Sequence, residues 1–198
     1  MVAYAVSSMP RMDDHLRFVI FGGQNAVKEA ASKIGFQQSF GYIEKVFDFE
    51  QSLNYSLPDG FHFVESKKLS VEKIAEGCWK GFDHEKEEGP CDGDAEYGYY
   101  TLMAPHMNPE DSIVIENDEG EYVCYAGMWW TPENHLAYME PLCTIPKYRK
   151  KGLAAALSEH YRRLKPLGAT HMTGGDNTFY EKIGFKLLIY WTFWEKAD

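Results

Sequence analysis

Basic residues are scarce in this sequence of 198 residues, which holds 20 lysines and arginines against 30 aspartates and glutamates. The formal net charge of -10 argues against a nucleic-acid-binding surface, because such a surface needs a basic face to neutralise phosphates. We therefore expect no nucleic-acid partner. An acidic chain is compatible with cationic substrates, although many soluble proteins are acidic without binding cations.

Cysteine is sparse as well, and long apolar runs are lacking. The four cysteines form no Cys-x-x-Cys pair and no histidine cluster lies beside them, so we expect no metal site. No signal peptide opens the sequence, and no apolar run approaches the length of a membrane span. These absences predict a cytoplasmic protein with reduced thiols and no membrane partner.

Apolar residues nevertheless make up 44% of the chain and aromatic residues 15%, which is enough for a packed core. Hydrophobic spacing predicts a helix at Val71–Phe82 with Ser70 as its N-cap. The acidic stretch Asp83–Asp94 contains glycine and proline and predicts a loop. Further elements are expected as strands at Phe61–Glu65, Ser112–Glu116, Glu121–Trp130 and Leu136–Ile145, and as a helix at Ala95–Met103.

A long amphipathic helix is predicted at Leu153–Lys165, with Gly168 as its C-cap. It connects the strand Leu136–Ile145 to a strand at Ala169–Thr173, an order that implies a parallel pair with a right-handed crossover. The earlier strands resemble an antiparallel meander, so the expected fold class is α/β with a mixed sheet. A short helix and a closing strand follow at Thr178–Lys182 and Lys186–Trp194.

The first part of the chain resembles the last part. Gly22-Gly23-Gln24-Asn25 is similar to Gly174-Gly175-Asp176-Asn177. Lys33-Ile34-Gly35-Phe36 repeats Lys182-Ile183-Gly184-Phe185. The pattern predicts an internal repeat, in which residues 1 to about 53 form a strand, a helix and an aromatic-rich β-hairpin. The alternative is that both segments are common helix C-caps with a hydrophobic contact.

The segment Arg149–Ala154 lies between a strand and a helix and has the chemistry of an anion site. Its small residues let the backbone approach a ligand, and the helix start offers unpaired N–H groups at the positive end of the helix dipole. Three basic residues add charge. No Gly-Lys-Ser/Thr follows, so the usual nucleotide P-loop does not fit. A solvated basic loop has the same pattern, and the motif alone does not decide between the two.

The run Leu142–Leu157 resembles the acetyl-CoA signature of the Gcn5-related N-acetyltransferase (GNAT) family. That signature has the form Arg/Gln-x-x-Gly-x-Gly/Ala after an apolar strand and a proline, and Arg149–Ala154 meets it here. Further on, Asn177–Phe185 is similar to the second family motif, an Asn followed by Tyr-Glu-Lys-x-Gly-Phe. The resemblance extends from about Phe61 to Trp194. The paired motifs are specific, whereas either one alone is a weak pattern.

The resemblance implies a GNAT-like acyl-CoA N-acyltransferase fold with acetyl-CoA as cofactor. In the family, backbone groups near Leu142–Thr144 would pair with the pantetheine arm like an added strand, and amides of Arg149–Ala154 would hold the pyrophosphate. The acetyl thioester would then face an acceptor amine. The cofactor-binding residues that this implies are Leu142, Cys143, Thr144, Arg149, Lys150, Lys151, Gly152, Leu153, Ala154 and Asn177.

Two residues are candidates for the proton transfers. Tyr180 matches the family tyrosine that often protonates the leaving thiolate, and its alternative role is aromatic packing on a short helix. Glu140 is the candidate general base, because even spacing places it on the same strand face as Leu142 and Thr144. Its alternative is an ordinary exposed carboxylate. For Asn177, a helix cap is favoured over contact with the cofactor arm.

The resemblance also divides the chain. Residues 1–55 are expected to be a non-catalytic partial GNAT-like repeat, and residues 56–198 a GNAT acetyltransferase domain. In the first copy Ala31 stands where the second has Tyr180, and no Arg-x-x-Gly-x-Ala segment precedes it. We therefore expect the first copy to pack structurally without catalysing.

The expected function is acetyl transfer from acetyl-CoA to a primary amine of a small molecule. An acyl-CoA-binding sensor or regulatory subunit without turnover is the main alternative, and a purely structural partner is a third. The oligomeric state is open, with a homodimer as one candidate. An acceptor site could be formed by acidic residues at 85–96 together with the aromatic residues Trp79, Tyr97, Tyr99, Tyr100, Trp129 and Trp130. The favoured alternative is a solvated acidic loop beside aromatic residues of the core.

Overall fold

The computed structural model describes residues 2–8, 16–92 and 107–196. The chain divides into two units. The central unit comprises residues 47–174, and the terminal unit combines residues 1–46 with residues 175–198. The helix expected at Ala95–Met103 lies outside the described residues.

The central unit contains a mixed sheet of five strands in the order β7-β6-β5-β4-β3. Neighbours from β3 to β6 are antiparallel, whereas β7 pairs with β6 in parallel at Leu136 and Ala137. The crossover between β6 and β7 contains the expected helix, α6 (Ala155–Leu164). The strands are β3 (Phe61–Phe63), β4 (Ile113–Asn117), β5 (Tyr122–Thr131), β6 (Leu136–Thr144) and β7 (His171–Thr173).

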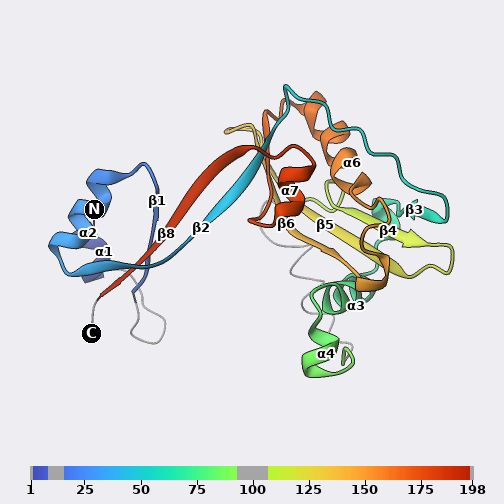
Figure 1. The fold of residues 1–198 in the computed structure, drawn as a ribbon, viewed down its shortest axis with the longest axis horizontal. Coiled ribbons are helices and arrows are strands. Elements are labelled where there is room, and N and C mark those ends of the chain that lie inside the picture. Colours follow the sequence, from blue (N-terminus) through green and yellow to red (C-terminus); the bar gives the residue numbers. More distant parts are fainter. Residues whose placement is uncertain (1, 9–15, 93–106, 197–198) are drawn as a thin grey trace. The chain divides into compact units, whose positions relative to one another are not determined.

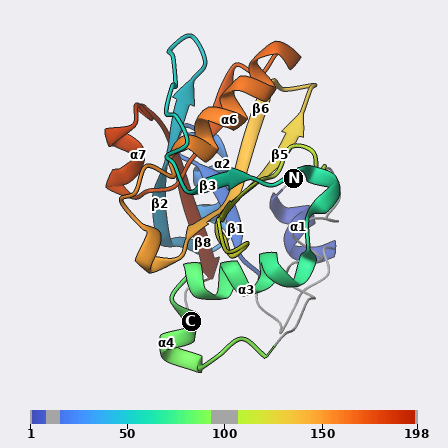
Figure 2. The same ribbon diagram turned by 90° about the vertical axis from the view of Figure 1, so that its right-hand side faces the viewer.

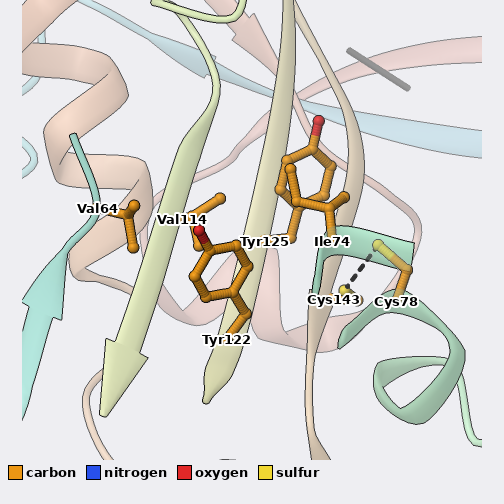
Figure 3. Packing of buried hydrophobic residues seen from close by; sticks show 7 residues of the cluster. All are labelled: Val64, Ile74, Cys78, Val114, Tyr122, Tyr125 and Cys143. Carbon is orange, nitrogen blue, oxygen red and sulfur yellow. Dashed lines mark hydrogen bonds between the residues drawn. The ribbon is translucent and has the colours of Figure 1, made fainter. Parts of the chain in front are cut away.

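Helices cover both faces of the central sheet, with α6 on one face and α3 (Val71–Gly81) on the other (Figure 1, Figure 2). On the α3 face, Ile74 and Cys78 pack against Val114 and Cys143 from the strands (Figure 3). A second buried cluster joins the opposite faces of the same strands to α6. Because both faces are buried, β5 is apolar along nearly its whole length and β4 is apolar at Ile113–Ile115. The mixed sheet and its helices confirm the predicted α/β class.

Local signals explain where the central helices begin and end. The Ser70 hydroxyl caps α3 as predicted, accepting a hydrogen bond of 3.2 Å from the Lys73 N–H. The stretch after α3, expected to be a loop throughout, contains the short helix α4 (His84–Glu88). Hydrogen bonds between side chains three and four residues apart stabilise this short helix. The glycine and proline of the predicted loop come after the helix ends. Short 3-10 turns lie at Ser66–Lys68, Pro146–Tyr148 and Lys165–Leu167.

The terminal unit contains an antiparallel sheet in the order β1-β8-β2. Two helices cover one face of it, where Ile20, Ala31, Phe36 and Trp194 form a buried cluster (Figure 1). A further short helix precedes β8. The elements are α1 (Val2–Ser8), β1 (Phe18–Phe21), α2 (Asn25–Lys33), β2 (Phe36–Asp48), α7 (Thr178–Lys182) and β8 (Leu187–Lys196).

The first segment has the predicted strand–helix–strand order, but the predicted hairpin is wrong. In its place β2 is a single strand of 13 residues, and its partner is β8 from the other end of the chain. Gly41 lies inside this strand, where an added Cβ would be 3.0 Å from the Trp191 carbonyl oxygen. The glycine therefore permits a close approach to β8 and does not form a turn. Helix α1 was not expected from the sequence.

The pairing of β8 also explains how the two units divide the chain. Because β8 lies between β1 and β2, residues 175–198 join the N-terminal segment. This division differs from the family boundary expected near residue 55, which stays a prediction. The helices in the described ranges are all too short or too polar to cross a membrane.

The two Lys-Ile-Gly-Phe segments have the same local backbone. Gly35 and Gly184 each follow a helix with a left-handed φ, 89° and 103°, a conformation that favours glycine. Phe36 and Phe185 come next and are both buried. A repeat predicts this agreement, and so does a common C-cap with a hydrophobic contact. The internal repeat therefore stays a prediction.

His160 on α6 is fully buried in the central unit. Its Nε2–H donates to the Ala126 carbonyl oxygen over 3.1 Å, which fixes the neutral tautomer because a carbonyl can only accept. Its Nδ1 has no hydrogen-bond partner among the described residues. Burial lowers the pKa of His160 to about 3.

We predict that His160 makes the fold sensitive to acid. An unfolded histidine has a pKa of about 6.5, so between pH 6.5 and about 3 the unfolded chain binds a proton that the native state does not. The free energy of unfolding should therefore fall by about 1.4 kcal/mol per pH unit as the pH drops through that window. His160→Gln keeps a neutral donor and should remove this contribution. Urea unfolding at pH 6.5, 5.5 and 4.5 measures the difference, with the exposed His62→Gln as control. If the free energy of unfolding changed with pH in the same way for the wild type and for His160→Gln, the prediction would be wrong.

Candidate functional site

A β-bulge interrupts β6 at its centre. Two residues, Glu140 and Pro141, stand opposite the single residue Gly127 of β5. An added Cβ on Gly127 would lie 2.4 Å from the Glu140 carbonyl oxygen, so the bulge requires glycine there. Because the bulge adds a residue, even spacing does not place Glu140 on the face of Leu142. The same-face argument is therefore wrong, while the role of Glu140 as a base stays a prediction.

The backbone of β6 beyond the bulge points its hydrogen-bonding groups away from β5. The Ile145 N–H donates to the Val123 carbonyl over 3.0 Å, and residues of an antiparallel ladder alternate between facing the partner and facing away. Counting back, the N–H and C=O groups of Thr144 and Leu142 face the opposite edge. Strand β7 pairs with β6 at Leu136 and Ala137 alone. Within the described central unit, no strand therefore lies along this edge after the bulge.

The side chains of these strand residues are engaged inside the protein. Leu142 packs in the cluster beneath α6. The Cys143 Sγ lies 3.6 Å from the Cys78 Sγ of α3 (Figure 3). The Thr144 hydroxyl donates to the Cys124 Sγ over 3.4 Å. What these residues offer to the open edge is thus their main chain.

The loop before α6 presents a row of free amides. The N–H groups of the five residues Lys150–Ala154 donate to no acceptor among the described residues. Ala154 is the N-cap of α6, and an alanine has no side chain with which to cap the first turn. Uncapped amides and the positive end of the helix dipole together favour an anion such as a phosphate.

Backbone conformation explains why the loop turns its amides outward. Lys150 and Gly152 have left-handed φ values of 64° and 86°. Turns of this kind form concave nests of N–H groups that bind anions. At Gly152 an added Cβ would also lie 2.9 Å from the Pro58 Cγ, so a larger residue has no room.

The three basic residues of the loop have different roles. The Arg149 guanidinium donates to the Gly81 carbonyl over 2.7 Å and pairs with the Asp83 carboxylate over 2.8 Å. It therefore ties the end of α3 to the end of β6. Lys150 and Lys151 are exposed and remain the residues whose charge can reach an anion beside the amides.

Glu140 has an environment suited to accepting a proton. Part of its side chain is exposed, and partial burial of the carboxyl raises its pKa above the usual value. A raised pKa makes a carboxylate a stronger base nearer to neutral pH.

The second sequence motif forms a packed segment of the terminal unit. The Asn177 Oδ1 accepts a hydrogen bond of 2.9 Å from the Phe179 N–H, which confirms its role as the cap of α7. The Tyr180 ring is buried between Phe179 and Phe185, with ring centroids 5.3 and 5.2 Å away. An added Cβ on Gly175 would lie 3.1 Å from this ring. The packing role of the ring is thus present, and the role of its phenol stays a prediction.

Sequence reasoning missed Lys45, which holds the segment before α7. Its nearly buried ammonium on β2 donates to the Asp176 carbonyl oxygen and lies 3.4 Å from the Glu181 carboxylate. Lysine is rarely buried unless it is paired. A lysine directly before the apolar residues Val46 and Phe47 was the available signal.

A cavity of about 220 Å³ lies beside α3 in the central unit. Its lining includes Trp79, Phe82, His84, Cys78 and Asp92. The rings of Trp79 and His84 stack at 5.0 Å, and the Trp79 indole N–H donates to the Gly89 carbonyl over 2.9 Å. Of the aromatics expected at an acceptor pocket, Trp79 lines this cavity, Trp129 and Trp130 lie on β5, and Tyr97, Tyr99 and Tyr100 are outside the described residues.

Comparisons with known proteins agree with this geometry. The acetyltransferase (GNAT) domain model matches residues 108–187, a range that holds both sequence motifs. No curated protein matches the sequence.

Solved structures show the same fold at low sequence identity. A GCN5-related N-acetyltransferase from Sphaerobacter thermophilus is similar with a TM-score of 0.61 and 13% identity, over 92% of this chain and 60% of that one. One from Kribbella flavida gives 0.60 and 16%, over 93% and 69%. A tandem GNAT protein from the clavulanic acid biosynthesis pathway gives 0.61 and 13%, over 93% and 65%.

The chain thus spans 60% of the length of the first of these structures. At these identities the structures establish the fold alone, and the family model matches residues 108–187. Residues 108–187 of this chain belong to the acetyltransferase (GNAT) domain family.

Proposed function

We propose that this chain is an acetyl-CoA-dependent N-acetyltransferase acting on a primary amine of a small molecule. The observation that carries the proposal is a pair of backbone surfaces in the central unit that offer hydrogen-bonding groups to a ligand. One is the outward-facing main chain of Leu142 together with the N–H of Thr144, whose carbonyl oxygen accepts from the Arg149 Nε–H over 3.1 Å. The other is the row of free amides at Lys150–Ala154. An extended polar arm that ends in a pyrophosphate matches both.

Each surface has a role in holding acetyl-CoA, which supplies the activated acetyl group. The main chain of Leu142 and the N–H of Thr144 would hydrogen-bond the pantetheine arm as an added strand does. The amides of Lys150–Ala154 would hold the pyrophosphate, with Lys150 and Lys151 adding charge. The donor set fits the group, because free amides beside the positive end of a helix dipole favour an anion.

Two residues perform the proton transfers in this proposal. An acceptor amine must be neutral to attack, and Glu140 takes its proton directly or through water. Tyr180 gives a proton to the departing thiolate. The buried Lys45 pairs with the exposed Glu181 and holds the segment on which Tyr180 lies, so Lys45 is a positioning residue.

The acceptor class follows from the cavity beside α3. Its aromatic wall of Trp79 and Phe82 suits an apolar body, and Asp92 at its lining suits a cationic amine. Cys78 also lines the cavity and contacts Cys143, so the cavity adjoins the strand whose edge receives the cofactor. The proposed acceptor is therefore an amine with a small apolar or aromatic body.

An amine library tests the activity itself. The protein is incubated with acetyl-CoA and each amine, and release of the CoA thiol is followed. Amine-dependent thiol release supports the enzyme. Binding of acetyl-CoA without release under any amine would support the sensor alternative in its place.

We predict that Ala154→Asp abolishes acetyl-CoA binding without harming the fold. An aspartate at this position adds a negative charge beside the free amides of Lys150–Ala154, where it should repel the pyrophosphate. Thermal denaturation measures both effects. The wild type should gain about 2.7 kcal/mol at acetyl-CoA concentrations of about 100 times Kd, and the variant should gain nothing.

Two further variants serve as controls for Ala154→Asp. Gly23→Asp introduces the same charge in the terminal unit, where an added Cβ meets open space, and should keep the full response. Gly152→Asp should lose the response and also melt earlier, because its backbone is left-handed and Pro58 is close. A normal ligand-induced shift in Ala154→Asp would refute the assignment of the loop.

We predict that Tyr180→Phe keeps acetyl-CoA binding and lowers kcat by roughly two to four orders of magnitude, the range of general acid catalysis. The substitution removes one hydroxyl and little volume, so the packing with Phe179 and Phe185 persists. The wild-type rate should fall at alkaline pH as the acid loses its proton, and the variant should lack that limb.

Glu140→Gln is the matched variant for the opposite limb of the profile. The wild-type rate should fall as the pH drops through the raised pKa of Glu140, because the protonated carboxyl accepts no proton. The glutamine variant should lose this acidic limb and keep the alkaline one.

For Tyr180, the contradicting outcome is an equal rate and an identical pH profile for the wild type and Tyr180→Phe, which would remove the tyrosine from the mechanism.

A further inference from the structure

Exposed apolar side chains gather in the terminal unit. The described residues include twelve exposed large hydrophobic side chains, and nine of them belong to this unit, although it is the smaller of the two. Apolar surface concentrated in this way marks an interaction site more often than scattered residues do.

The strand register places part of this surface on one face of the terminal sheet. Val19 and Phe40 stand on either side of Phe193. Phe21 and Tyr42 stand on either side of Trp191 in the next row. Side chains directly opposite each other share a face, so these residues form two rows across β1, β8 and β2. We call them the aromatic face: Val19, Phe21, Phe40, Tyr42, Trp191 and Phe193.

The rings of the aromatic face lie against one another and leave their outer sides exposed. Phe21 and Trp191 have ring centroids 4.7 Å apart, and Tyr42 stacks on Trp191 at 5.8 Å. Phe40 is 59% exposed and Val19 47%. Helices α1 and α2 pack on the other face of the sheet, against Ile20 and Trp194. No helix of the described terminal unit covers the aromatic face.

The two units differ in net charge. The terminal unit has eight basic and eight acidic residues, so its formal charge is zero. The central unit has twelve basic and twenty-two acidic residues and carries the whole net charge of -10. At the rim of the aromatic face, Arg17 and Glu195 already pair with each other.

We propose that the aromatic face is a homodimer interface, at which two copies of this chain pack face to face about a two-fold axis. Such an interface must be complementary to itself. A neutral apolar face with an internally paired rim meets that condition, whereas a face of one charge sign repels its own copy. A face without net charge also gives no basis for selecting a charged partner.

The size of the aromatic face fits this partner. An aromatic side chain buries roughly 150–250 Å² when fully covered, so three exposed and three partly exposed side chains offer on the order of 400 Å². A standard interface buries about 800 Å² per partner, and rim residues around the face supply the remainder. Aromatic residues are also enriched at interface cores. This inference does not depend on the proposed enzymatic function.

Sedimentation velocity on the full chain tests the interface. The wild type should sediment with twice the chain mass of 22.7 kDa, and Phe40→Asp should sediment as a monomer. A carboxylate buried without a partner in the interface should weaken association at least 100-fold. Tyr4→Asp is the control, because Tyr4 is 69% exposed on α1 and lies away from the aromatic face.

Each outcome decides the question. A second variant, Val19→Asp, guards against misfolding, and both variants should keep the wild-type circular dichroism spectrum and melt cooperatively. Dimers for wild type and Tyr4→Asp with monomers for Phe40→Asp and Val19→Asp establish the interface. A wild type that stays monomeric at about 100 μM overturns it, and so does a dimer that persists in both aspartate variants.

Discussion

Backbone hydrogen bonding along β6 is the constraint on which the candidate site depends. Strand β7 pairs with β6 at Leu136 and Ala137, and the bulge opposite Gly127 follows a few residues later. Beyond it, the main chain of Leu142 and Thr144 keeps donors and acceptors that β5 cannot reach. An extended ligand that pairs with this edge therefore gains main-chain hydrogen bonds of the kind that an added strand makes.

Side chains around this edge stabilise its shape, and the Arg149 Nε–H also donates to the Thr144 carbonyl oxygen. Cys143 packs against α3, and Arg149 ties the end of that helix to the loop before α6. The loop in turn holds its amides outward through the left-handed residues Lys150 and Gly152. Main-chain hydrogen-bonding groups therefore follow one another in sequence from β6 through the loop to the start of α6, while the side chains beside them pack in the apolar core.

Much of this could be predicted from the sequence, because the signals are local. Ser70 and Asn177 cap their helices as their residue types indicate, and the strands of the central unit follow their apolar spacing. The rest depends on contacts between distant segments. The bulge opposite Gly127 shifts the face of Glu140, and alternation within β6 alone contains no sign of it. The pairing of β2 with β8, and the ion pair of Lys45 with Glu181, join residues that no short motif can relate.

The terminal unit is built from both ends of the chain, and this has a consequence for how the protein is made. Residues 47–174 are complete as a unit once they leave the ribosome, whereas β1 and residues 36–46 of β2 lack their partner strand until β8 has been synthesised. At roughly 5–20 residues per second, this part of β2 waits several seconds for β8. During that interval the nascent chain carries an open strand edge, the feature most prone to mispairing with another chain.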